Sequence, residues 1–224
     1  METHLSIIEQ ANSQVVASCW QDRWPDGSVS SSCLTNNKIR LYNFSQSLKE
    51  LRCRHGFIHT NTITIKKSLF DKAGVFPAGL CKRGGDIATW LRVLSENDGL
   101  AYLDKETAVY HREASTVTRN TPIDIQTDCV YRECIILKKL NPNLASEIMM
   151  ISNKYILYGL ADRMKKGLLT RNDMSFFYIS KNKKIGWTLM FFSFMPLIVQ
   201  KKTYELLYGL LARIGFSNKK LLWK

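Results

Sequence analysis

The spacing of hydrophobic and polar positions changes along the chain. Residues 59–66, HTNTITIK, alternate β-branched and polar side chains, which is typical of a half-buried strand. Residues 87–97 instead place apolar side chains at helical spacing and are followed by Gly99, which predicts a helix with a defined end. The first part of the chain is therefore expected to mix strands and helices.

Further elements follow from the same signals. A short helix and a strand are expected over 3–18, and a short helix over 67–73 ended by Gly74. Strands are predicted at 100–103 and 107–111, and helices over roughly 123–139, 144–166 and 171–180. We place a domain boundary near Asn120, which gives a mixed α/β domain over 1–120 and a helical region over 121–224.

Composition indicates a globular protein with an uneven distribution of charge. The 224 residues are 45% hydrophobic and 23% charged, unlike a disordered chain. The formal net charge is +13, and thirteen lysines and arginines between Arg163 and Lys224 face only two acidic residues there. A near-neutral domain is thus joined to a basic tail, and basic tails bind nucleic acid or anionic lipid.

The tail also carries a long apolar run. Residues 186–199 are uncharged, but they are fewer than the about 20 that a membrane-spanning helix needs, and Pro196 interrupts them. Lysines flank this run, and an amphipathic segment follows over 204–214. The pattern over 181–224 favours helices lying in the interface of an anionic membrane; helices packed on the first domain are the alternative. Nucleic acid is not expected as a partner, because it requires basic residues without such an apolar run.

The cysteines and the N-terminus bear on location. Six cysteines include no CxxC pair and no Cys/His zinc spacing, and residues 1–10 lack the pattern of a signal peptide. We therefore expect free thiols and a cytoplasmic protein. Together with the tail, this predicts a peripheral protein on the inner face of the cytoplasmic membrane.

One carboxylate stands out as a candidate for chemistry. Asp86 lies at the start of the predicted helix, directly after Gly84 and Gly85, which allow a substrate or backbone to approach closely. A carboxylate held there is suited to act as a general base for a substrate hydroxyl. The alternative is an ordinary aspartate that caps the helix.

Three segments, in this order, resemble the inverting family-2 glycosyltransferases. Residues 62–76 match a strand followed by basic residues, a short helix and a G-x-F element. Residues 85–92, GDIATWLR, match an acidic loop that leads into a helix with an arginine. Residues 108–115, AVYHREAS, match a strand end with Tyr, His or Arg and serines. The resemblance implies a GT-A, Rossmann-like sheet domain, a nucleotide-sugar donor and a saccharide acceptor, which the membrane-binding tail suggests is lipid-linked.

The resemblance also implies roles for single residues. Asp86 matches the catalytic base, with Gly84 and Gly85 beside the substrate. Arg92 would face the same cleft or remain a solvated helix arginine, and Trp90 would form a platform for an acceptor sugar or belong to the core. His111 would lie near the donor diphosphate and a divalent metal, Mg²⁺ or Mn²⁺, or be a strand-end histidine bonded to backbone.

Two departures from the family pattern limit these expectations. Gly85 occupies the position where the family often has Glu, and no Asp-x-Asp metal motif occurs in the chain. The family's opening nucleotide-binding segments also have no counterpart. We therefore expect an acceptor-side, truncated part of such an enzyme that is inactive alone. The alternative is a non-catalytic, membrane-associated partner in polysaccharide assembly.

Overall fold

The computed structural model describes residues 2–33, 38–54, 56–81, 83–112, 125, 128–179 and 183–213. The chain has a mixed α/β fold and divides into two compact units, Met1–Pro122 and Ile123–Lys224. The boundary predicted near Asn120, the serine of residues 108–115, and tail residues 181–182 and 214–224 lie outside the described residues.

The first unit contains five strands and their connecting helices among its described residues. In chain order these are α1 (Glu2–Gln10), β1 (Val15–Arg23), β2 (Val29–Ser31), β3 (Ile39–Tyr42), α2 (Phe44–Cys53), the 3-10 helix η1 (Thr60–Thr62), β4 (Ile63–Ile65), α3 (Lys67–Ala73), α4 (Gly85–Asn97) and β5 (Leu100–His111).

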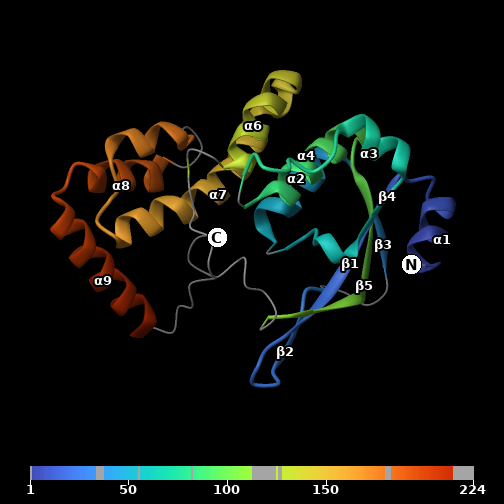
Figure 1. Ribbon diagram of the computed structural model, residues 1–224, viewed down its shortest axis with the longest axis horizontal. Coiled ribbons are helices and arrows are strands. Elements are labelled where there is room, and N and C mark those ends of the chain that lie inside the picture. The colour runs from blue at the N-terminus through green and yellow to red at the C-terminus, as the bar shows by residue number, and fades with distance from the viewer. Residues whose placement is uncertain are drawn as a thin grey trace. The chain divides into compact units, whose positions relative to one another are not determined.

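The sheet is built around the parallel pair β1 and β5 (Figure 1). Its strand order is β2-β1-β5-β3, with β4 also pairing with β1. β4 pairs with the beginning of β1 and β2 with its end, both antiparallel, and β3 runs antiparallel to β5. The first six residues of β1 are all buried, as expected for a central strand covered on both faces.

β5 differs from the sequence prediction of two separate strands. It is continuous over twelve residues, with an irregularity where pairing passes from Ser18–Leu103 to Cys19–Glu106. Asp104 and Lys105 are thereby left out of the register, as in a β-bulge, and Thr107 is left out at the next step, from Cys19–Glu106 to Trp20–Ala108. The polar run 104–107 resembles a turn in the sequence, and pairing with β1 overrides that local signal.

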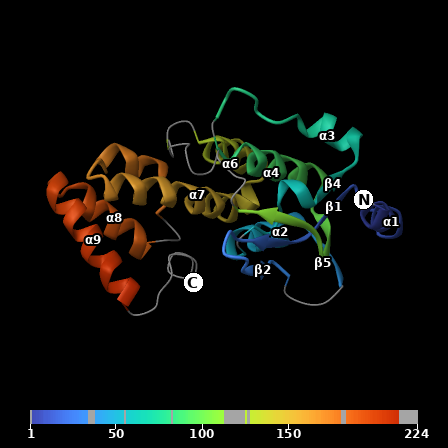
Figure 2. The ribbon, with the colours of Figure 1, turned by 60° about the horizontal axis from the view of Figure 1, so that its bottom comes forward.

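Helices cover the sheet through residues at helical spacing. Ile7 and Ile8 of α1 pack on β1 and β5, and His4 of α1 lies buried between the hydroxyls of Ser18 and Thr64, 3.0 and 2.8 Å away. α3 packs beside α4 (Figure 2). Helix α4 buries Trp90, Leu91 and Leu94 of the apolar positions that predicted it, leaves Ile87 half-buried, and begins at Gly85, two residues before the predicted start.

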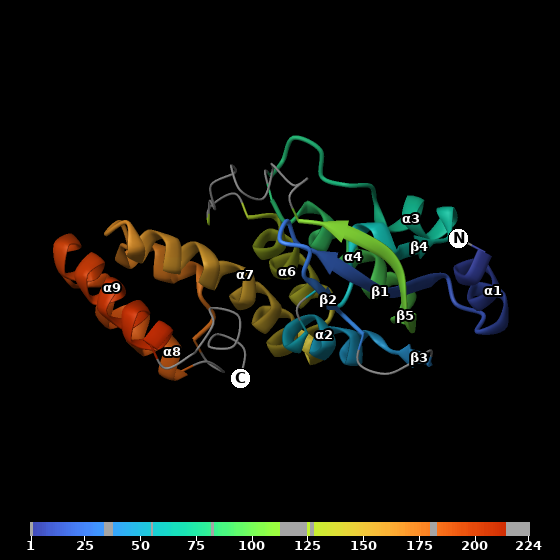
Figure 3. The same ribbon diagram turned by 90° about the horizontal axis from the view of Figure 1, so that it is seen from below.

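The second unit is helical in its described residues. Its elements are α6 (Cys129–Leu140), η2 (Pro142–Leu144), α7 (Ala145–Lys165), η3 (Arg171–Phe176), α8 (Lys183–Ser193) and α9 (Leu197–Arg213). The predicted helix over 171–180 is a shorter 3-10 helix, and Thr170 and Asp173 form a capping box at its start. α8 and α9 follow one another around a turn at Pro196 (Figure 3).

Apolar residues of α7 hold this unit together, and two buried amides fix its turns. Gln200 accepts from the Leu169 backbone N–H at 3.2 Å and donates to the Leu169 carbonyl at 2.9 Å. Asn153 bonds in the same two-sided way to the backbone of Tyr178, at 2.7 Å in each direction. Within the described residues, none of the helices combines the length and apolar character needed to cross a bilayer.

Candidate active site

Asp86 lies in the first turn of α4 and is half-buried. The turn begins at Gly84, whose φ of +74° is a left-handed conformation that favours glycine. One carboxylate oxygen of Asp86 accepts from the Ile87 backbone N–H at 2.9 Å. The other accepts from the Thr60 hydroxyl at 3.3 Å. The carboxylate is thus oriented by two donors and remains within reach of a further hydroxyl.

Gly85 is enclosed by its neighbours. A Cβ at this position would lie 3.2 Å from a ring carbon of Pro77 and 3.5 Å from the Cys81 sulfur. A side chain at this position would require the Pro77 ring to give way by a few tenths of an ångström, so the space favours glycine.

Two residues expected beside Asp86 point elsewhere. Trp90 is 2% exposed, its ring meets Phe76 edge-on at 5.4 Å, and its indole N–H has no hydrogen-bond partner among the described residues. A ring buried to this extent presents no open face to a sugar. Arg92 donates to the Val75 carbonyl at 2.9 Å and to the Thr89 hydroxyl at 3.3 Å. It thereby ties the loop that follows α3 to helix α4.

His111 is the last residue of β5, where it is exposed and pairs in register with Arg23 of β1. Within the described part of the chain, no group of three metal-ligating side chains includes His111 or Asp86. A Mg²⁺ or Mn²⁺ ion prefers several oxygen ligands. The described residues around His111 do not provide such a set.

The carboxyl ends of β1 and β5 carry a group of charged and aromatic side chains that the sequence did not single out. Arg112 follows β5 and forms an ion pair of 2.8 Å with Asp22 of β1. The Arg112 guanidinium also lies over the rings of Trp24 and Tyr110, 5.1 and 5.0 Å from their centroids. The Trp20 indole N–H donates to Asp22 at 3.3 Å. Charge and aromatic surface are thereby combined at one end of the parallel pair.

His59 connects this group to Asp86. Its ring lies 4.9 Å from that of Trp20 and 5.0 Å from that of Tyr110, centroid to centroid. The next residue, Thr60, donates to Asp86. Asp86 therefore lies near the carboxyl ends of the parallel strands, where open α/β sheets bind their ligands.

The residues that were missed gave little signal in the sequence. Asp22 and Arg112 are ninety residues apart and meet only because β1 and β5 pair in parallel. His59 lies at the start of a segment that reads simply as a strand. A prediction that β1 and β5 are neighbours would have been needed to bring these residues together.

The cysteines follow the expectation of free thiols only in part. Cys19, Cys33, Cys53 and Cys134 are free. Cys81 and Cys129 are disulfide-bonded, so the expectation is wrong for these two. Spacing along the chain carries no information on whether a cysteine that lacks a motif is oxidised.

No protein-family model matches this chain, and no curated protein matches it. Its function is therefore inferred from its residues and their arrangement.

Proposed function

We propose that this chain forms the acceptor side of a glycosyltransferase of the inverting, GT-A type, with Asp86 as the general base. The observation that carries the proposal is the position of Asp86, which is linked through Thr60 and His59 to the carboxyl ends of β1 and β5. The resemblance of residues 62–76, 85–92 and 108–115 to the family supports the same assignment.

The chemistry assigned to Asp86 is a single proton transfer. The acceptor hydroxyl loses its proton to the free lone pairs of the Asp86 carboxylate as its oxygen forms a bond to the anomeric carbon of the donor. The bond from that carbon to the nucleotide diphosphate breaks on the opposite side, so the configuration inverts. The Ile87 N–H and the Thr60 hydroxyl hold the carboxylate in place. No step is assigned to a metal, because the described residues near His111 do not suit Mg²⁺ or Mn²⁺.

The acceptor is proposed to be lipid-linked, because the second unit displays an apolar surface. Trp187 and Phe191 of α8 are each 63% exposed, as is Phe194 in the following turn. Trp187 and Phe191 lie one turn apart on the same face of α8, and Ile198 of α9, beyond the turn, extends this apolar stripe with a side chain that is 72% exposed. Exposed lysines border it, namely Lys183, Lys201 and Lys202. An aromatic stripe with basic borders suits an anionic membrane surface.

A non-catalytic role is the second candidate. The absence of an Asp-x-Asp from the sequence favours it, because the family uses that motif to hold the donor. The chain would then be a membrane-associated partner in a polysaccharide assembly complex, and Asp86 would only cap α4.

The test is best made in cells of the source, where any partner polypeptide is present. The coding sequence is deleted, and membranes are assayed for transfer of radiolabelled sugar from a panel of nucleotide sugars to lipid-extractable saccharide. Adding back the wild-type gene is expected to restore transfer. Asp86→Asn keeps the size of the side chain but removes the base. The rate of transfer that it restores is therefore expected to be about 10²–10⁴-fold below that of the wild type.

Asp71→Asn is the matched control, because Asp71 is an exposed carboxylate on the neighbouring helix α3. It should restore the wild-type rate. If deletion changes no sugar transfer, the glycosyltransferase proposal is wrong. If deletion abolishes transfer and Asp86→Asn restores it fully, the non-catalytic partner role replaces it.

A further inference from the structure

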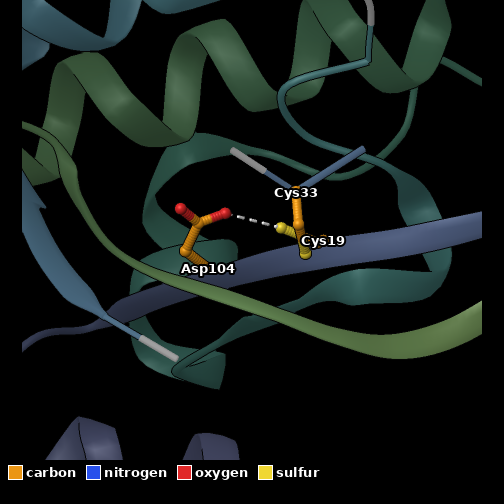
Figure 4. A group of neighbouring side chains, drawn as sticks. All are labelled: Cys19, Cys33 and Asp104. Carbon is orange, nitrogen blue, oxygen red and sulfur yellow. Dashed lines mark hydrogen bonds between the residues drawn. The ribbon is translucent and has the colours of Figure 1, made fainter. Parts of the chain in front are cut away.

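Three side chains that can bind a soft metal ion meet within the first unit, apart from the residues around Asp86. Cys19 lies on β1, Cys33 follows β2, and Asp104 lies on β5 (Figure 4). The two sulfurs and one carboxylate oxygen all lie within 4.8 Å of one another. No other group of this kind is found in the described part of the chain.

The pairing of β1 with β2 brings the two cysteines together. Gln21 pairs with Ser31, and this antiparallel register, continued by two residues, sets Cys19 opposite Cys33. The strands do continue in this way, since the Ser32 backbone N–H donates to the Trp20 carbonyl at 3.0 Å. Side chains directly opposite each other in such a pair lie on the same face of the sheet.

The irregularity in β5 adds the carboxylate. Asp104 is one of the three residues of β5 left out of the register with β1, and bulges of this kind redirect side chains. Its backbone N–H donates to the Lys38 carbonyl at 2.9 Å, which holds the bulge in place. The side chain is 2% exposed and accepts from the Cys19 thiol at 3.1 Å (Figure 4). The three ligand atoms thus come from three different strand segments.

The separation of these atoms suits a tetrahedral ion. A zinc ion bound by sulfur and oxygen holds the two ligand atoms about 3.6 Å apart, so Cys19 and Asp104 would need to move by only about half an ångström. Thiolate ligands select zinc over the harder Mg²⁺ and Mn²⁺. Cys19 is fully buried, whereas Cys33 is only half-buried, which leaves a path from solvent on the Cys33 side.

A cationic side chain lies beside the cluster. Arg54 donates to the Ser32 carbonyl at 3.0 Å and to the Tyr102 hydroxyl at 3.2 Å. The Tyr102 hydroxyl in turn donates to the Cys19 sulfur at 3.6 Å. Two thiolates and a carboxylate around a divalent ion leave one net negative charge, and the nearby guanidinium, which also pairs with Glu50 at 3.7 Å, favours such a charge. Hydrogen bonds of this kind orient ligands around bound metals.

We propose that Cys19, Cys33 and Asp104 bind one thiophilic divalent cation, zinc in the first place, with the fourth position open to water. Binding releases the two thiol protons to solvent and forms two sulfur–metal bonds and one oxygen–metal bond. The ion ties β1, β2 and β5 together next to the carboxyl ends of the parallel strands. This site is independent of the proposed glycosyl transfer.

The test is a titration of the purified full-length chain, kept reduced by a phosphine, with Co²⁺ and then Zn²⁺. Tetrahedral cobalt with thiolate ligands gives an intense charge-transfer absorption, and one equivalent of Zn²⁺ should abolish it by displacement. Cys33→Ser removes a ligand and is expected to weaken cobalt binding by at least about 100-fold. Replacing a residue that only hydrogen-bonds to a metal ligand already lowers metal affinity by about 10–100-fold. Cys53→Ser, at an exposed cysteine of α2, is the matched control and should bind as the wild type does.

Asp104→Asn provides a second variant that retains both cysteines, and it is expected to bind cobalt more weakly while keeping part of the thiolate absorption. Circular dichroism of each variant without metal checks that the fold is unchanged. The proposal is overturned if the reduced wild-type chain binds no cobalt through thiolates. It is equally overturned if Cys33→Ser binds cobalt as tightly as Cys53→Ser does.

Discussion

The two units differ in the side chains that their candidate sites bring together. In residues 1–122, charged side chains gather at the carboxyl ends of β1 and β5, and each is oriented by a hydrogen bond or an ion pair, as Asp22 is by Arg112. In residues 123–224, α8 and α9 leave large apolar side chains such as Trp187 and Ile198 exposed. A surface of the first kind suits a polar ligand and one of the second kind suits a lipid. Under the proposed function, the first unit would recognise the sugar and the second unit would bind the membrane.

The largest expected effect concerns the apolar stripe of the second unit. Replacing Trp187, Phe191 and Phe194 together by serine is expected to weaken binding to vesicles that contain anionic phospholipid by about 100-fold or more. The estimate takes about 25 cal/mol for each Å² of apolar surface that these side chains would bury in the interface. Flotation of the full chain with such vesicles measures the bound fraction.

The matched control is a triple serine variant in the first unit, at Leu41, Val75 and Leu80, which are each 63–65% exposed. It should float as the wild type does, because these residues do not form a stripe with basic borders. Equal losses for both triple variants would remove the distinction between the units. Unchanged flotation of the first variant would rule out the stripe as the membrane surface.

A smaller effect concerns pH. All four histidines belong to residues 1–122, and burial lowers the pKa of His4 below its ordinary value. The unfolded chain therefore binds more protons than the folded chain, so the stability that neutral His4 gives is complete above about pH 6.5 and is lost as pH falls below it. Between pH 7.5 and pH 5, the free energy of unfolding should fall more in the first unit than in the second unit. Amide hydrogen exchange, followed separately in the two units, measures this difference.

His4→Gln isolates the contribution of this residue. It keeps at most one of the two hydrogen bonds to Ser18 and Thr64 and is expected to cost about 1 kcal/mol at pH 7.5. The difference between variant and wild type should shrink at pH 5, because only the wild type has a buried imidazole to protonate. If the difference in stability between variant and wild type stays constant with pH, protonation of His4 does not contribute to the loss of stability at low pH.

Local patterns predicted the elements of the fold better than the contacts between them. The helical spacing over 87–97 predicted α4, because that pattern reflects a face that the helix itself buries. The strand predicted over 59–66 is correct only for Ile63–Ile65, which forms β4, because Thr60–Thr62 is a 3-10 helix. β5 was predicted as two strands, because nothing local shows that Asp104 and Lys105 form a bulge within a continuous strand.

The same limit applies to the sites. The position of Asp86 at a helix start could be predicted, because Gly84, Gly85 and the helical pattern are adjacent in the sequence. The ion pair of Asp22 with Arg112 could not, since it depends on pairing between strands ninety residues apart. The cluster of Cys19, Cys33 and Asp104 has none of the short spacings that identify zinc motifs, because each ligand comes from a different strand segment.

The most direct test of a shared site at Asp86 and the strand ends is hydrogen exchange of the purified chain with an acceptor. The probe is the lipid-extractable saccharide fraction from membranes of the deletion cells, where an unused acceptor accumulates. Protection is expected together at residues 60–62, 85–89 and 108–111, and it should persist in Asp86→Asn, which loses the base but not the binding surface. Absence of protection at these three segments, or protection confined to α8 and α9, would contradict the account.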